Sequence, residues 1–111
     1  MTVRTLSERI GCTSFTGELP DCEITGVYAG DLLSRAMGKI REGNLWITIM
    51  TNKNVVAVAD LADPAAILFA EGAAPMPDAV QAAKETGVPL LSSEKSVYDL
   101  CLEIGRALSE K

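Results

Sequence analysis

Polar residues follow each of four predicted strands at the point where the strand ends. Ligands of open α/β sheets bind beyond the carboxyl ends of parallel strands, so these residues would converge if the sheet is parallel. Free backbone amides at a strand-to-helix junction, with nearby hydroxyl and amide side chains, can hold an anion. We take as candidate ligand-binding residues Asp31, Arg35, Thr51, Asn52, Asn54, Glu71, Gly72, Ser92 and Ser93.

The two junctions that begin at Thr51 and at Ser92 also have a structural interpretation. Asn52 or Asn54 could cap the next helix, because a side-chain oxygen satisfies free amides in the first turn. Ser92 or Ser93 could cap the last helix in the same way. Helix caps are commoner than binding sites, so capping is favoured at both junctions and ligand binding is the alternative.

The pairs Asp31/Arg35 and Glu71/Gly72 each allow two interpretations. Asp31 and Arg35 are four residues apart, the spacing of an ion pair within a helix, whereas Arg35 as a binding residue would face a carboxylate or phosphate. Gly72 is expected to supply an unusual backbone angle. Glu71 could act as a general base only beside a reacting group, and the sequence places no nucleophile next to it. Turn formation is therefore favoured for Glu71 and Gly72.

The sequence lacks the residues that common catalytic and metal sites need. It contains no histidine, which excludes Ser-His and Cys-His nucleophiles and removes the commonest transition-metal ligand. Its three cysteines, Cys12, Cys22 and Cys101, show no C-x-x-C spacing. The only Gly-Lys step, Gly38-Lys39, is followed by Ile40 where a P-loop needs serine or threonine. We therefore predict no catalytic residues, no metal and no cofactor.

The amino-acid composition limits the possible fold classes and the kinds of partner. A chain of 111 residues with 48% hydrophobic and 5% aromatic content suits one domain with an aliphatic core. The net charge of −5 and the absence of a Lys/Arg cluster exclude nucleic acid as the main partner and argue against a membrane surface. No apolar run could span a bilayer, and the first residues show no secretory signal. We expect a cytoplasmic location.

The elements that must position these residues alternate in the second half of the chain. Strands are predicted at Cys22–Tyr28, Leu45–Met50, Ala65–Ala70 and Val88–Leu91; helices are predicted from Thr5 to Gly11, after Asp31, from Pro77 to Gly87, and after Ser93. Strands that alternate with helices indicate a parallel sheet. Thr48 shares a strand face with Trp46 and Met50, and its hydroxyl predicts a less apolar face, at an edge or a partner surface.

The segment Asn54–Ala62 is ambiguous by pattern. It could be a strand that returns from a four-residue hairpin loop at Thr51–Asn54. It could equally be a crossover helix that ends before Asp63-Pro64. Periodicity does not separate these two alternatives.

Three segments together resemble a known family: GDLLSRAMGK, GNLWITIMTNKNVVAVADLADPAAILFAEG and SSEKSVYDL. They resemble the DRTGG domain, which is similar in turn to the N-terminal domain of HPr kinase/phosphorylase and, more remotely, to those of Mur ligases. The resemblance covers residues 23–106 and implies a cytoplasmic, regulatory, self-associating module. It favours the helix for Asn54–Ala62. The run Asp-Arg-Thr-Gly-Gly does not occur here, so no residue-level function is carried over.

These observations together predict a fold and a function. We expect a single α/β domain over residues 1–111, with a core at 23–106 and an N-terminal helix and extended segment at 1–22. Its central, mostly parallel sheet would have about four strands flanked by helices. We expect a non-catalytic regulatory module that forms a homodimer and binds a small anionic ligand or a partner protein. The alternative is an accessory enzyme of acyl or phosphoryl transfer, with a kinase disfavoured because no P-loop is present.

Overall fold

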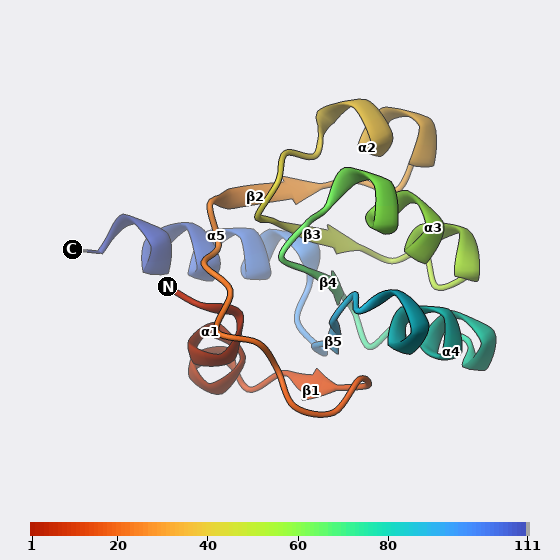
Figure 1. Cartoon of the computed structure of the whole chain (residues 1–111). Helices are drawn as coiled ribbons and strands as arrows, with labels where there is room; N and C mark the ends of the chain where they lie inside the picture. Colours follow the sequence, from red (N-terminus) through yellow and green to blue (C-terminus); the bar gives the residue numbers. More distant parts are fainter. Residues whose placement is uncertain (111) are drawn as a thin grey trace.

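A computed structural model describes residues 1–110 as five strands and five helices around one sheet (Figure 1). The helices are α1 (Val3–Ile10), α2 (Leu33–Lys39), α3 (Lys53–Ala62), α4 (Pro77–Thr86) and α5 (Val97–Ser109). The strands are β1 (Thr13–Ser14), β2 (Gly26–Ala29), β3 (Asn44–Thr48), β4 (Ala66–Phe69) and β5 (Leu90–Ser92). In the described part of the chain, no helix combines the length and the apolar character that crossing a bilayer requires.

The sheet has the order β1-β5-β4-β3-β2. Strands β2 to β5 pair in parallel, and β1 pairs with β5 in the antiparallel sense. The predicted α/β class and mostly parallel sheet are confirmed. The sheet has five strands instead of about four, because β1 is only two residues long and carries no periodic pattern.

Two layers of helices cover the two faces of the sheet. Helices α2, α3 and α4, which connect successive parallel strands, lie together on one face, and α1 and α5 lie on the other (Figure 1). Side chains of β3 alternate between these layers: Leu45 and Ile47 pack towards α1 and α5, and Trp46 packs towards α2, α3 and α4. This double burial explains why the parallel strands are apolar at nearly every position.

Thr48 lies in this buried environment, with no exposed surface. The prediction that it marks an edge or a partner surface is wrong. A threonine is tolerated there because its hydroxyl finds hydrogen-bonding partners in the carboxyl-end loops, as described below.

Helix α3 resolves the ambiguous segment in favour of the helix. Asn52 caps its N-terminus, and its C-terminus ends at Asp63, whose φ of 58° is left-handed. Pro64 follows directly and cannot continue the helix. The helix is therefore indicated by signals at the two ends of the segment. The apolar pattern within the segment does not distinguish a helix from a strand.

The N-terminal helix begins earlier than predicted. Thr2 caps α1, and Thr5 is its third helical residue, with which Thr2 forms a reciprocal capping box. Gly11 closes the helix with a φ of 73°, as expected. Val3 and Leu6 have no exposed surface, so residues of this helix form part of the main core.

Candidate functional site

The parallel strands β2 to β5 end at the same edge of the sheet, which we call the carboxyl edge. Helices α2, α3, α4 and α5 each follow one of these strands and begin at this edge. All nine predicted ligand-binding residues lie in the strand ends, loops and first helical turns there. The backbone positions of these nine residues therefore converge at one edge of the sheet, as the ligand-binding hypothesis requires.

The loops of the carboxyl edge are tied together by backbone hydrogen bonds. The amide of Met76 donates to the carbonyl of Thr51 at 3.0 Å, which joins the loop before α3 to the loop before α4. The amide of Gly72 donates to the carbonyl of Ser93, and that of Glu71 to the carbonyl of Lys95, each at 2.9 Å. The edge is thus a connected layer of loops.

The side chain of Asp31 forms hydrogen bonds with residues at the end of β3. Its carboxylate accepts a hydrogen bond from the Thr48 hydroxyl at 2.7 Å and another from the Ile49 amide at 3.0 Å. Helix α2 begins after it, with Leu32 as the N-cap and no side-chain cap. The predicted ion pair with Arg35 is wrong, because Asp31 lies outside the helix and no such pair occurs among residues 1–110.

The loop before α3 confirms the capping interpretation for Asn52. The Asn52 side chain accepts a hydrogen bond from the Asn54 amide at 2.9 Å, so Asn54 takes part only through its backbone. Lys53, which the sequence reasoning missed, is the first residue of α3 and is exposed. No local pattern identifies it, because a cation in the first turn of a helix opposes the helix dipole and does not contribute to capping.

Glu71 and Gly72 form a tight turn after β4. Both have positive φ, 59° and 75°, and the amide of Ala73 closes the turn on the carbonyl of Ala70 at 3.0 Å. Two central residues with positive φ characterise a type I′ turn. The prediction of an unusual backbone angle at Gly72 is confirmed, and Glu71 shares it.

The junction after β5 is longer than predicted. Ser92 ends the strand, and the Ser93 hydroxyl accepts a hydrogen bond from the Lys95 amide at 3.1 Å. The cap of α5 is Ser96, which accepts from the Asp99 amide at 3.1 Å. The prediction that Ser92 or Ser93 caps this helix is wrong, because Ser92 belongs to β5 and the Ser93 carbonyl accepts from the Gly72 amide in the loop that follows β4.

The carboxyl edge divides into two halves of different charge. The half at α2 and α3 carries two exposed cations, Arg35 and Lys53, without an ion pair among residues 1–110. It also carries one exposed carboxylate, Asp31, which accepts hydrogen bonds from Thr48 and Ile49. The half at β4 and β5 carries Glu71 and Glu94, both exposed. A Cβ on Gly72 would lie 2.6 Å from a Glu94 carboxylate oxygen. An anion is therefore better accommodated at α2 and α3.

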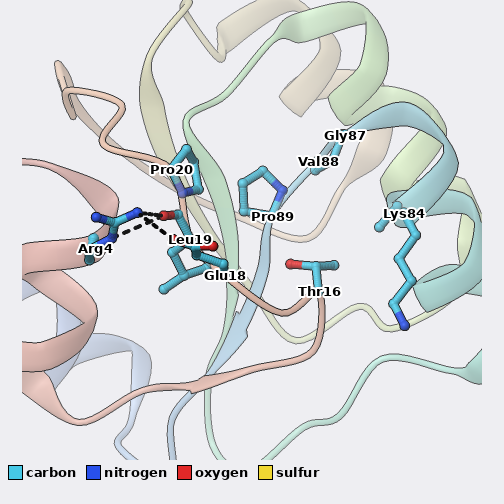
Figure 2. Close-up of a pocket in the computed structure, with 10 residues that line it drawn as sticks. Arg4, Thr16, Glu18, Leu19, Pro20, Lys84, Gly87, Val88 and Pro89 are labelled. Atoms are coloured by element: carbon cyan, nitrogen blue, oxygen red, sulfur yellow. Dashed lines mark hydrogen bonds and ion pairs between the residues drawn. The ribbon is translucent and has the colours of Figure 1, made fainter.

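The opposite edge of the sheet, the amino edge, is hollowed. A cavity of about 470 Å³ lies between the segment Thr16–Pro20 and the end of α4 (Figure 2). Arg4 at its rim is already engaged, because it donates to the Leu19 carbonyl at 2.7 Å and pairs with Asp21 at 3.2 Å. This cavity and three further ones within residues 1–110 do not include Arg35, Thr51 or Asn52.

The amino edge is also less suited to an anion than the carboxyl edge. Helices α3 and α4 end there, and the C-terminal end of a helix carries partial negative charge. Asp60 and Asp63 line a second cavity of about 270 Å³, which shares Pro20 and Pro89 with the first. Both of these hollows therefore lie at the amino edge, whereas the N-termini of α2 to α5 lie at the carboxyl edge.

Two of the three cysteine thiols, those of Cys12 and Cys101, are partly shielded from solvent. Burial raises the pKa of Cys12 to about 11, although nearby Lys95 opposes the shift, and burial also raises the pKa of Cys101. Raised pKa values keep these thiols protonated and unreactive at neutral pH. Within residues 1–110, no cluster of carboxylates and thiols has the arrangement of a metal site.

No protein-family model matches the sequence. No curated protein matches it in sequence either. A solved structure with a similar fold is that of the CBS and DRTGG domains of the regulatory region of Clostridium perfringens pyrophosphatase, complexed with its activator diadenosine tetraphosphate. The match has a TM-score of 0.67 at 10% sequence identity and covers 88% of this chain and 43% of that one. The chain thus spans less than half of that neighbour, and the likeness supports a DRTGG-like fold.

Proposed function

We propose that the chain is a non-catalytic regulatory module that binds a small anionic ligand at the α2 and α3 half of the carboxyl edge. The structural neighbour is a regulatory region complexed with diadenosine tetraphosphate, a polyphosphate anion. That likeness supports a regulatory role, and the charge distribution of this chain supports the class of ligand. Self-association and contact with a partner protein belong to the same proposal.

The observation that carries the proposal is the presence of two exposed cations, Arg35 and Lys53, without an ion pair among residues 1–110, where α2 and α3 begin. The two helices pack side by side, and both begin at the carboxyl edge. The N-terminal end of α3 carries partial positive charge, which favours an anion. Arg35 lies in the first turn of α2, and Lys53 is the first residue of α3. Both side chains are free to neutralise a phosphate or carboxylate at this place.

The non-catalytic assignment is supported by the residues of the chain itself. Without histidine or a P-loop, acyl or phosphoryl transfer would need another base or phosphate clamp. Glu71, the carboxylate of the turn after β4, is exposed and has no nucleophile within its turn. Turnover of acetyl phosphate or ATP by pure protein, abolished by Thr51→Ala, would overturn this assignment.

A thermal-shift titration tests the proposed site. The probes are inorganic phosphate, AMP, ATP and diadenosine tetraphosphate. A ligand at about 100 times its Kd stabilises the native state by about 2.7 kcal/mol, and each kcal/mol raises Tm by roughly 4–8 °C in a domain of about 100 residues. We expect a shift that Arg35→Ala and Lys53→Ala each reduce.

The control is Arg41→Ala. Arg41 is an exposed cation in the loop after α2, and its hydrogen bonds, both with Asn44, involve only its backbone. The shift should survive this change. Asn52→Ala is unsuitable because it also removes a helix cap. If none of the four probes raises Tm, or if Arg41→Ala abolishes the shift as fully as Lys53→Ala, the site is rejected.

A further inference from the structure

The outward face of α5 exposes large apolar side chains. Tyr98 is 72% exposed and Leu102 is 38% exposed, although the opposite face of the same helix buries Leu100 and Ile104 completely in the core. The helix lies on the side of the sheet away from α2, α3 and α4 (Figure 1). The outward face of α5 therefore carries two large apolar side chains, Tyr98 and Leu102, that remain exposed within the described domain.

A shallow hollow lies beside these side chains on the same face. It has a volume of about 580 Å³ and is lined by Cys101, Leu102, Gly105, Arg106, Ser109 and Glu110. A Cβ added to Gly105 would meet nothing within 4 Å, so the helix backbone is open there. A protruding tyrosine and an open glycine thus occur on one helix face, seven residues apart.

Two opposite charges flank this face with the same spacing. Asp99 and Arg106 are both exposed, are seven residues apart, and take part in no ion pair among residues 1–110. The other nearby charges are committed: Glu103 pairs with Lys95 at 2.9 Å, and Glu110 pairs with Arg9 at 2.7 Å. Asp99 and Arg106 are therefore the charges left for an external partner.

We propose that α5 packs antiparallel against α5 of a second copy, about a two-fold axis at Leu102. The midpoint between Tyr98 and Gly105 in the sequence falls just before position 102, and the midpoint between Asp99 and Arg106 falls just after it. A two-fold axis there sets Leu102 against its own copy and places each Tyr98 ring over the open Gly105 of the other chain. It also sets Asp99 opposite Arg106, twice, since a two-fold interface repeats every contact.

The charge pattern of this face is complementary to that of a second copy in the antiparallel arrangement. A parallel arrangement would set Asp99 against Asp99 and Arg106 against Arg106, whereas the antiparallel one pairs opposite charges at both ends. Tyrosine that fills a pocket is a common anchor of protein interfaces. This inference rests on the proposed self-association and assigns the surface that carries it.

Sedimentation velocity of the full chain over a wide range of concentrations tests the interface. We expect the wild type to reach the mass of a dimer. Arg106→Asp and Asp99→Arg should each sediment as monomers, because each sets like charges opposite one another. An equimolar mixture of the two variants should recover the dimer, since opposite charges then meet at both ends of the heterodimer.

Arg41→Asp, a charge reversal on the α2 loop, is the matched control and should remain dimeric. Circular dichroism confirms that each variant is folded. A monomeric wild type at every concentration, single variants that stay dimeric, or a mixture that stays monomeric would each overturn the proposal. Thermal-shift titration of the wild type separates the two ideas: a wild type that is monomeric but binds an anion rejects only the dimer, and a dimeric wild type that binds none rejects only the anion site.

Discussion

The carboxylate of Asp31 accepts a hydrogen bond from the hydroxyl of Thr48 at 2.7 Å. Thr48 is fully buried at the end of β3, and its hydroxyl oxygen in turn accepts from the Met50 amide at 3.2 Å. An exposed acid from the loop after β2 thus satisfies a buried hydroxyl and holds the start of the loop that leads to α3. This contact fixes the α2 and α3 half of the carboxyl edge.

Replacement of Asp31 should destabilise the domain through Thr48. Asp31→Ala leaves the Thr48 hydroxyl and the Ile49 amide without their acceptor, so we expect a loss of about 1–3 kcal/mol in the free energy of unfolding. Urea denaturation of Asp31→Ala, Thr48→Val and the double variant measures the coupling, which should be about 0.5–3 kcal/mol. Losses that simply add would show that the two side chains act independently.

The two asparagines before and in α3 should differ in their contribution to stability. Asn52→Ala removes the helix cap and should lower the free energy of unfolding by about 0.5–2 kcal/mol. Asn54→Ala keeps the backbone amide that donates to Asn52, so it should change the free energy of unfolding by less than about 0.5 kcal/mol. Urea denaturation compares them, with Asn52→Asp as a variant that retains the cap. Equal losses for Asn52→Ala and Asn54→Ala would contradict the assignment.

The turn after β4 should be strengthened by a residue that tolerates a left-handed backbone. Glu71 has a φ of 59°, a conformation that costs most residues about 1–2 kcal/mol, and asparagine adopts it more readily. We expect Glu71→Asn to raise the free energy of unfolding by about 0.5–1 kcal/mol. Glu94→Asn removes a neighbouring negative charge without this backbone effect. A thermal scan that shows the same gain for both would assign the gain to charge.

The ion pair between α1 and the end of α5 should give a small dependence of stability on pH. Arg9 lowers the pKa of Glu110 below 4.5 by hydrogen bonding and charge. Because the folded pKa is the lower one, the contribution is complete above the unfolded pKa and is lost as the pH falls through the folded pKa. Both groups are exposed, so the effect should be small and weakened by salt.

Urea midpoints measured from about pH 6 to about pH 3 check this pH dependence. The wild type should lose slightly more stability than Arg9→Gln over that range at low salt, and the difference should vanish at high salt. A difference of the opposite sign, or one that persists in high salt, would show that the Arg9–Glu110 pair is not its source.

Local sequence signals predicted most of the regular elements correctly. Gly11 and Gly87 end their helices in left-handed conformations, and Pro77 begins α4. These signals work because a cap or a turn involves atoms only a few residues apart. The apolar runs that became β3 and β4 were equally clear, since parallel strands bury both faces.

The roles of individual polar residues were decided by contacts between distant parts of the chain. Asp31 bonds to Thr48, seventeen residues away, and not to Arg35, its neighbour in sequence. The Ser93 carbonyl accepts a hydrogen bond from the loop after β4, and the residue that caps α5 is Ser96. A hydrogen-bonding side chain takes whichever partner the fold brings within reach, and no local spacing encodes that partner.

The sequence by itself determined the class of the fold, its alternation of strands and helices, and the lack of histidine and P-loop chemistry. Only the tertiary structure decided that the cations Arg35 and Lys53 lie in the first turns of neighbouring helices, and that the cavity beside Thr16 and Pro89 lies at the other edge. It also decided which face of α5 remains exposed. The reason is physical: apolar periodicity is a property of a single segment, whereas a surface is formed by segments that meet only after the chain has folded.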